Sequence, residues 1–194
     1  MQRAYRIRVS YEGLTSHLYR EYLIGNTSTL RDLGLLVAVS FDSNADKEIR
    51  FDQNGQLISL MRPTGRKNSP RSTPAPETIA LKQLRMVRGS RLLVFYGDRF
   101  DHTFIVQFIE AVDYDGEFDL PLVLDGAGRG ILEELGPYHF IPLVRDILRH
   151  GVSEMTYRSP KTGILTEWDI RCYDAREDQQ TLASGMDMAS AIYE

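Results

Sequence analysis

The first residues of the chain alternate between hydrophobic and polar side chains. Residues 5–11 have a period of two and are rich in β-branched and aromatic residues, which is typical of a half-buried strand. Residues 17–24 show a similar composition and end just before Gly25 and Asn26. Because Glu12-Gly13 provides a turn after the first segment, we predict an antiparallel hairpin at the start of the chain.

The spacing of hydrophobic residues then changes to that of a helix. Residues 27–29 are Thr-Ser-Thr, and their hydroxyl groups suit an N-cap. The following apolar residues share one helical face and are Leu30, Leu33, Leu36 and Val37. We therefore predict an amphipathic helix over residues 30–39.

Short strands are predicted on both sides of a proline-rich segment. That segment, residues 62–76, contains four prolines and several Ser and Thr residues, so we predict a mobile loop there. Residues 78–84 indicate a short helix or turn. The predicted strands are 49–51 and 57–60, which flank the Asn54-Gly55 turn signal, and 91–96 and 103–109, whose short connection favours antiparallel pairing.

The C-terminal half has weaker patterns. Residues 113–136 are acidic and contain glycine, so we predict a long ordered loop. Apolar spacing over residues 140–148 predicts a helix, whereas residues 152–168 are ambiguous. A terminal helix is predicted around Met186–Ile192. We predict an α+β fold with a mixed, mainly antiparallel sheet, in which a ββα unit and further strands pack against one to three helices.

Bulk properties favour an intracellular protein with no special stabilising chemistry. The net charge is −4, and Cys172 is the sole cysteine, so neither an internal disulfide nor a cysteine-rich zinc site can form. Cys172 is expected to be a semi-buried structural residue. The N-terminal residues lack the apolar core of a signal peptide, and the longest apolar run, residues 33–40, is too short for a membrane span. We expect a cytoplasmic location, no membrane association and no cofactor.

Several short motifs in order resemble one known family. Residues 5–13 and then 29–33 match its opening, and residues 95–102 (Phe-Tyr-Gly-Asp-Arg-Phe-Asp-His) are similar to its hallmark, with Glu110 as the acidic residue after the next strand. These motifs resemble the plasmid pRiA ORF-three-like family over about residues 5–150. The resemblance implies an α+β domain over residues 1–150, associated with mobile genetic elements and without an established activity, followed by an extension at 151–194.

The chain departs from that family pattern at several positions. The family often has cysteine where this chain has Val123 and Leu135, and His-Leu-His where it has residues 47–49. The hallmark tryptophan is Phe100. The resemblance therefore implies a divergent member, without any site that relatives build from those thiols and imidazoles.

One connection between predicted strands concentrates groups that can carry chemistry. Asp98, Asp101 and His102 provide carboxylates and an imidazole, which can bind a divalent metal or act as acid and base. Glu110 would lie roughly 26 Å from His102 along a straight strand, so the two cannot share a metal. A purely structural role is the simpler alternative, because Gly97-Asp98 is ordinary turn chemistry.

A second cluster lies in the acidic segment. Asp125, Glu133 and Glu134 are its candidate ligand-binding residues, and the glycines at 126, 128 and 130 let the backbone bend between them. Residues 126–130 lack the spacing of a phosphate-binding loop. We predict that this segment folds against residues 98–102.

The basic residues are concentrated before these acidic ones. Residues 62–99 contain nine basic and two acidic residues, whereas residues 101–134 contain one basic and nine acidic residues. A separately solvated, dipolar surface is the simpler interpretation. The alternative is nucleic-acid binding, for which the candidates are Arg62, Arg66, Lys67 and Arg71.

Three functions follow from these residues. The favoured one is a non-enzymatic module that binds an unknown protein partner, linked to mobile genetic elements, because no complete catalytic constellation is present. The alternatives are a metal-dependent or acid–base enzyme that uses Asp98, Asp101 and His102, and a nucleic-acid-binding protein that uses residues 62–99.

Overall fold

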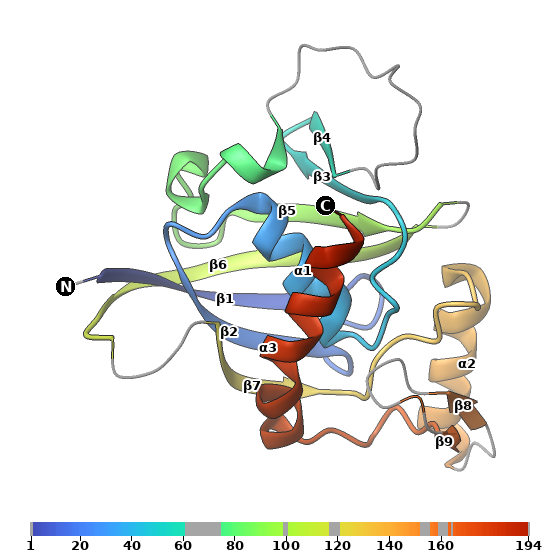
Figure 1. The fold of residues 1–194 in the computed structure, drawn as a ribbon. Coiled ribbons are helices and arrows are strands. Elements are labelled where there is room, and N and C mark those ends of the chain that lie inside the picture. The colour runs from blue at the N-terminus through green and yellow to red at the C-terminus, as the bar shows by residue number, and fades with distance from the viewer. Residues whose placement is uncertain are drawn as a thin grey trace.

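The computed structural model describes residues 2–60, 75–98, 101–116, 121–151, 156–158, 163 and 165–193. They form the predicted α+β fold, in which a seven-stranded sheet has the order β4-β3-β5-β6-β1-β2-β7 (Figure 1). The strands are β1 Gln2–Tyr11, β2 Tyr19–Gly25, β3 Ile49–Gln53, β4 Gln56–Leu60, β5 Arg91–Tyr96, β6 His102–Tyr114 and β7 Leu122–Ala127. Every pairing between these described strands is antiparallel.

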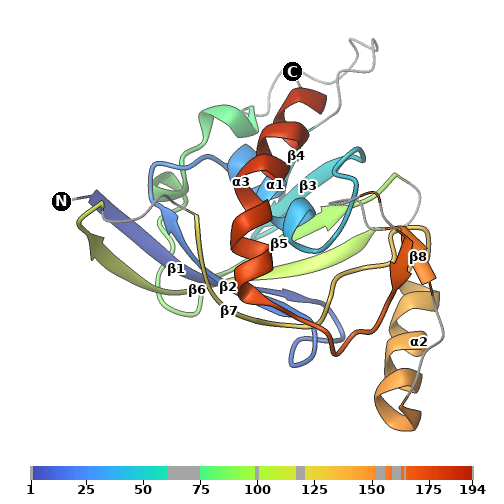
Figure 2. The same ribbon diagram turned by 60° about the horizontal axis from the view of Figure 1, so that its bottom comes forward.

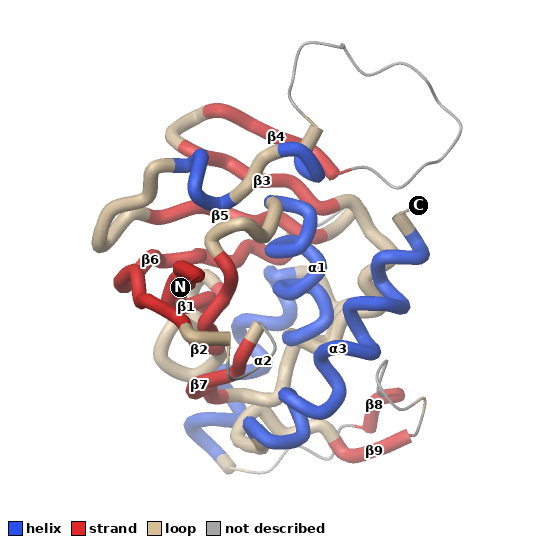
Figure 3. Tube along the Cα trace, turned by 60° about the vertical axis from the view of Figure 1, so that its left-hand side comes forward, coloured by secondary structure: helices blue, strands red, loops and turns tan. Residues whose placement is uncertain are grey.

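Two helices cover one face of this sheet, and a third lies beyond its end. The helices are α1 Leu30–Ser40, α2 Pro137–His150 and α3 Ala175–Ile192, with short 3₁₀ turns η1 Pro76–Thr78 and η2 Leu81–Leu84. Helices α1 and α3 lie on the same side of the sheet (Figure 3), whereas α2 lies near the small pair β8 Thr156–Arg158 and β9 Leu165–Glu167 (Figures 1 and 2). No described helix is both long and apolar enough to cross a membrane.

Local signals in the N-terminal half are confirmed. Strands β1 and β2 pair as a hairpin, and α1 begins after Thr29. The Thr29 hydroxyl accepts a hydrogen bond from the Asp32 amide while the Asp32 carboxylate accepts one from the Thr29 amide, which satisfies two otherwise unpaired groups. Asn54 and Gly55 have φ values of 54° and 86°, as the tight turn between β3 and β4 requires.

The prediction of a continuous loop over residues 113–136 was wrong. Strand β6 extends to Tyr114, and β7 forms an edge of the sheet beside β2. The strand signal in β7 is diluted by Asp125 and Gly126, and its side chains are exposed or only half-buried. The outer backbone of β7 is covered from α3, because the Val123 amide donates to the Gln179 side chain at 2.7 Å.

The C-terminal elements are more extensive than predicted. Helix α3 begins at Ala175 rather than near Met186, and the Asp174 carboxylate caps it by accepting hydrogen bonds from two backbone amides. Its first turns are polar, so the apolar pattern marked only its last part. The ambiguous region contains β8 and β9. Residues 61–74, on which most of the predicted mobile loop falls, lie outside the described residues.

Glycine allows the helical layer to approach the sheet closely. A Cβ atom added to Gly34 in α1 would lie 2.8 Å from the Phe51 ring, and one added to Gly185 in α3 would lie 2.6 Å from Val39. Such distances are shorter than real contacts, so both positions need the absence of a side chain. Trp168, Leu182 and other residues after 150 join the same core as the sheet.

A buried arginine connects α3 to the sheet. Arg20 in β2 is fully buried, and its Nε donates to Asp178 of α3 at 2.7 Å. Its Nη1 donates to the carbonyls of Tyr19 and Ala127, and its Nη2 donates to that of Arg129. These four hydrogen bonds and the Asp178 counter-ion compensate the guanidinium inside the protein, as a buried charge requires.

We expect Asp178→Asn to destabilise the fold by about 3–5 kcal/mol, because it leaves the buried Arg20 cation without its counter-ion. The free energy of unfolding from urea titrations measures this effect. Asp146→Asn, which removes the exposed partner of His150, serves as the control and should leave stability nearly unchanged. Equal stabilities of the two variants would contradict the central role of the Arg20–Asp178 pair.

Candidate functional site

Four of the six predicted ligand-binding residues line one cleft of about 250 Å³. The cleft lies where β5 ends and β6 begins, facing the segment that precedes α2. Its lining residues are Lys47, Tyr96, Gly97, Asp98, His102, Glu133, Glu134 and Gly136. The structure thus brings Asp98, His102, Glu133 and Glu134 together, although residues 98 and 133 are far apart in the sequence. Their role in binding stays a prediction.

His102 is a buried residue that lines this cleft and is held by hydrogen bonds. It is 2% exposed, and its Nδ1 lies 3.0 Å from the Tyr11 hydroxyl oxygen. Its Nε2 lies 3.5 Å from the backbone carbonyl oxygen of Glu133. Since a carbonyl can only accept, the tautomer that fits has Nε2 donating to Glu133 and Nδ1 accepting from Tyr11. Both ring nitrogens are therefore engaged within the protein.

Glu133 and Lys47 form the charged wall of the cleft. Glu133 Oε2 accepts a hydrogen bond from the Asn44 amide at 2.7 Å, and Oε1 lies 3.5 Å from Lys47 Nζ. Lys47 Nζ also lies 3.3 Å from Asp46 Oδ1. Burial opposes the charge of Lys47, but the two carboxylates outweigh it, so the pKa of Lys47 is raised. Lys47 remains a cation with its charge already matched.

Two carboxylates at the rim of the cleft have few hydrogen bonds with the described residues. Asp98 is exposed, and its Oδ1 accepts a long hydrogen bond of 3.3 Å from the Glu48 amide. Glu134 is exposed and has no hydrogen bond or ion pair with any residue that the structure describes. Because Lys47 is the single cation among the lining residues, the cleft has an excess of negative charge.

The other predicted residues lie elsewhere. Asp101 pairs with Arg50 and borders a separate hollow, which Tyr138 also lines. Asp125 lies on β7 and accepts a hydrogen bond from the Tyr19 hydroxyl at 3.0 Å. Glu110 pairs with Arg6, consistent with its exclusion from the site. The four nucleic-acid candidates lie outside the described residues and are Arg62, Arg66, Lys67 and Arg71.

Sequence reasoning missed Lys47 and Tyr96. Lys47 lies in the connection after α1, and no motif joins that connection to the strands. Tyr96 was placed in a strand and in the hallmark segment but not among the candidate site residues, yet its hydroxyl accepts a hydrogen bond from the Asp46 amide at 3.3 Å. Alternation in β5 could have placed Tyr96 on the inner face, but nothing local indicates that the face ends in a cleft.

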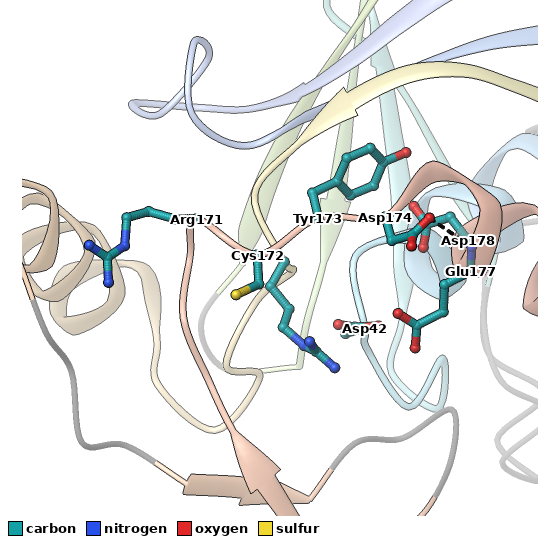
Figure 4. A pocket seen from close by; sticks show the side chains of 8 residues that line it. Asp42, Arg171, Cys172, Tyr173, Asp174, Glu177 and Asp178 are labelled. Carbon is teal, nitrogen blue, oxygen red and sulfur yellow. Dashed lines mark hydrogen bonds between the residues drawn. The ribbon is translucent and has the colours of Figure 1, made fainter.

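A second hollow, of about 340 Å³, lies beside the start of α3 (Figure 4). Cys172 borders it and is exposed, so the prediction of a semi-buried structural thiol was wrong. The Arg171 side chain points away from the acidic group that includes Asp42 and Glu177 (Figure 4) and pairs instead with Asp169 at 2.6 Å. This hollow shares no lining residue with the cleft.

The donor groups do not form a metal centre in the part of the chain that the structure describes. No three His, Cys, Asp or Glu residues there are arranged to hold a metal ion. The acid–base version of the enzyme prediction is not tested by this observation and stays a prediction.

Comparisons with known proteins give a fold and no activity. No family model matches the chain, and no curated protein matches its sequence. The fold is similar to the crystal structure of MM3350 from Methanosarcina mazei Go1, a protein of unknown function, with a TM-score of 0.68 and 14% sequence identity. The match covers 91% of this chain and 97% of that one. Membership of the plasmid pRiA ORF-three-like family stays a prediction.

The buried imidazole makes stability depend on pH. Burial lowers the pKa of His102 from its ordinary value of 6.5. Between the lowered pKa and pH 6.5 the unfolded chain binds more protons than the folded one, so stability falls as the pH drops through this range. We expect His102→Gln to flatten this dependence, measured by urea unfolding from pH 7.5 downward.

The matched control is His150→Gln, because the His150 side chain is 73% exposed. This variant should keep the pH dependence of the original protein below pH 6.5. If His102→Gln kept it as well, the buried His102 would not be its source.

Proposed function

We propose that this protein is a binding module and that its cleft accepts a cationic group of a protein partner. The observation that carries the proposal is the charge of the cleft: Asp98, Glu133 and Glu134 face a space that Lys47 alone balances. A link to mobile genetic elements is part of the proposal and rests on the resemblance of residues 5–13 and 95–102 to the plasmid pRiA ORF-three-like family.

The detailed contacts favour a cation over other ligands. Glu133 and Lys47 are already paired, so the groups available to a ligand are the rim carboxylates of Asp98 and Glu134. A lysine or arginine side chain could donate hydrogen bonds to both carboxylates, and charge-assisted hydrogen bonds are stronger than neutral ones. An anion would meet repulsion from these groups and find no unpaired cation among the lining residues.

The arrangement favours binding over catalysis. A general base must have a nitrogen or oxygen free to reach the substrate. Both nitrogens of His102 are engaged by Tyr11 and Glu133. The histidine therefore has a structural role, because it fixes the position of the Glu133 backbone. The rim carboxylates of Asp98 and Glu134 are the groups that would bind the ligand.

The proposal predicts weak binding of a free lysine side chain. The probe is N-acetyl-lysine amide, added to isotope-labelled protein and followed by NMR. Backbone amide shifts should move at residues 97–98 and 133–136. The uncharged isostere N-acetyl-norleucine amide should cause no such shifts, because it cannot pair with the carboxylates. Shifts with neither the lysine nor the corresponding arginine probe would overturn the proposal.

The rim carboxylates should account for this affinity. The double variant Asp98→Asn/Glu134→Gln should bind the lysine probe about tenfold more weakly, since two exposed charge pairs contribute on the order of 1.4 kcal/mol together. Asp125→Asn/Asp146→Asn is the matched control, because it also removes two exposed carboxylates, both outside the cleft. An equal loss in this control would indicate non-specific electrostatics.

A further inference from the structure

A second charged surface lies far from the cleft. It is formed by four exposed cations from η2 to the first residue of β5, which we name the basic edge: Lys82, Arg85, Arg88 and Arg91. No acidic residue occurs between Glu77 and Asp98. On sequence alone, these four residues were part of the wider basic region 62–99, and the named candidates all lay within residues 62–71.

The described residues do not neutralise the cations of the basic edge. None of the four forms an ion pair with any residue in the described part of the chain. Most other arginines of the sheet are matched: Arg6 and Arg8 pair with Glu21, and Arg50 pairs with Asp101. The basic edge therefore concentrates uncompensated positive charge in a protein whose net charge is −4.

The backbone of the basic edge is fixed by hydrogen bonds. The Gly89 amide donates to the Phe108 carbonyl at 2.9 Å, and the Phe108 amide donates to the Ser90 carbonyl at 2.9 Å. The Ser90 hydroxyl accepts a hydrogen bond from the Val87 amide, and the Gln53 side chain donates to the Leu84 carbonyl. The cations thus project from an ordered turn that strands β3 and β6 hold in place, which reduces the entropy lost on binding.

The acidic cleft does not cancel this charge. Arg91 begins β5 and Tyr96, which lines the cleft, ends it. A strand of six residues spans about 17–20 Å. That separation is about twice the Debye length of ~8 Å at physiological salt, so the cleft carboxylates are largely screened from a ligand at the basic edge.

The composition of the basic edge favours a phosphate backbone as the ligand. Three of its four cations are arginines, whose planar guanidinium matches phosphate oxygens in pairs. Residues 82–91 contain no aromatic side chain on which an unpaired base could stack. Val87, 68% exposed, is too small to anchor a protein interface or to insert into a membrane. Binding must therefore depend on charge alone, and double-stranded DNA has a higher density of phosphate charge than a single strand.

We infer that the basic edge binds the phosphate backbone of double-stranded DNA without sequence preference. Four phosphate contacts predict a slope of about −3.6 for the logarithm of the association constant against the logarithm of salt concentration. A rise from 50 to 200 mM salt should then weaken binding on the order of 100-fold.

The test is fluorescence anisotropy with a labelled duplex of about 24 base pairs over that salt range. Arg85→Gln/Arg88→Gln should reduce the steepness of the slope by about 2, because two contacts are lost. Arg149→Gln/Arg176→Gln changes the net charge equally at two exposed arginines elsewhere and should leave the slope unchanged. Circular dichroism establishes that each variant is folded.

Two further probes separate the alternatives. The single strand of the same sequence should bind more weakly than the duplex, and vesicles with 30% phosphatidylserine should bind no better than neutral vesicles. Absence of duplex binding at 50 mM salt would overturn the inference. So would equal slopes for the two double variants, tighter binding of the single strand, or binding to the acidic vesicles in place of the duplex.

Discussion

The burial of Arg20 is the constraint on which the rest of the structure depends. A guanidinium removed from water needs hydrogen-bond partners and a counter-ion, and here they come from β2, from residues 127 and 129 at and just after the end of β7, and from α3. Its plane also lies over the Tyr173 ring, with the central carbon 4.0 Å from the ring centroid. These requirements fix three separate parts of the chain around one side chain.

The hydrogen bonds of Arg20 also help to position the residues of the cleft. The carbonyls that Arg20 holds, at Ala127 and Arg129, lie just before the segment that carries Glu133. His102 then holds the Glu133 backbone from the sheet side, and the Asn44 amide holds its carboxylate. The acidic wall is therefore positioned from both ends, so Glu133 is held in place without a ligand.

Negative and positive charges lie at opposite ends of β5. The cleft lies at the Tyr96 end, and the basic edge lies at the Arg91 end. A module of this form could hold a cationic group of a partner and a polyanion at once, since each surface is screened from the other. The fold it shares with MM3350 provides the scaffold, whereas the two surfaces depend on this chain's own side chains.

The sequence predicted what short-range chemistry determines. The first hairpin, the Thr29 cap and the Asn54-Gly55 turn are local signals, and each was correct. Strand β7 was missed because it is an edge strand that pairs with β2 alone. Its side chains are exposed or half-buried, so its sequence shows little apolar alternation. The proximity of Asp98 and His102 to residues 133–134 was predicted from composition, but the contribution of Lys47 could not be, because it depends on tertiary packing.

The interior position of Arg20 was also beyond sequence reasoning. Within Leu18–Tyr22 it reads as an ordinary strand residue, and an arginine is rarely fully buried without a partner. Its partner Asp178 lies in a helix whose first turns are polar. A pair of charges 158 positions apart leaves no local pattern.

That long separation has a consequence for biosynthesis. Strands β1 and β2 are translated before α3, so the guanidinium between the layers lacks its Asp178 counter-ion until residue 178 has been translated. A nascent chain that closed its core before then would enclose a naked cation, which is unfavourable. We therefore expect α3 to complete the packing of the sheet only after residue 178 has emerged from the ribosome.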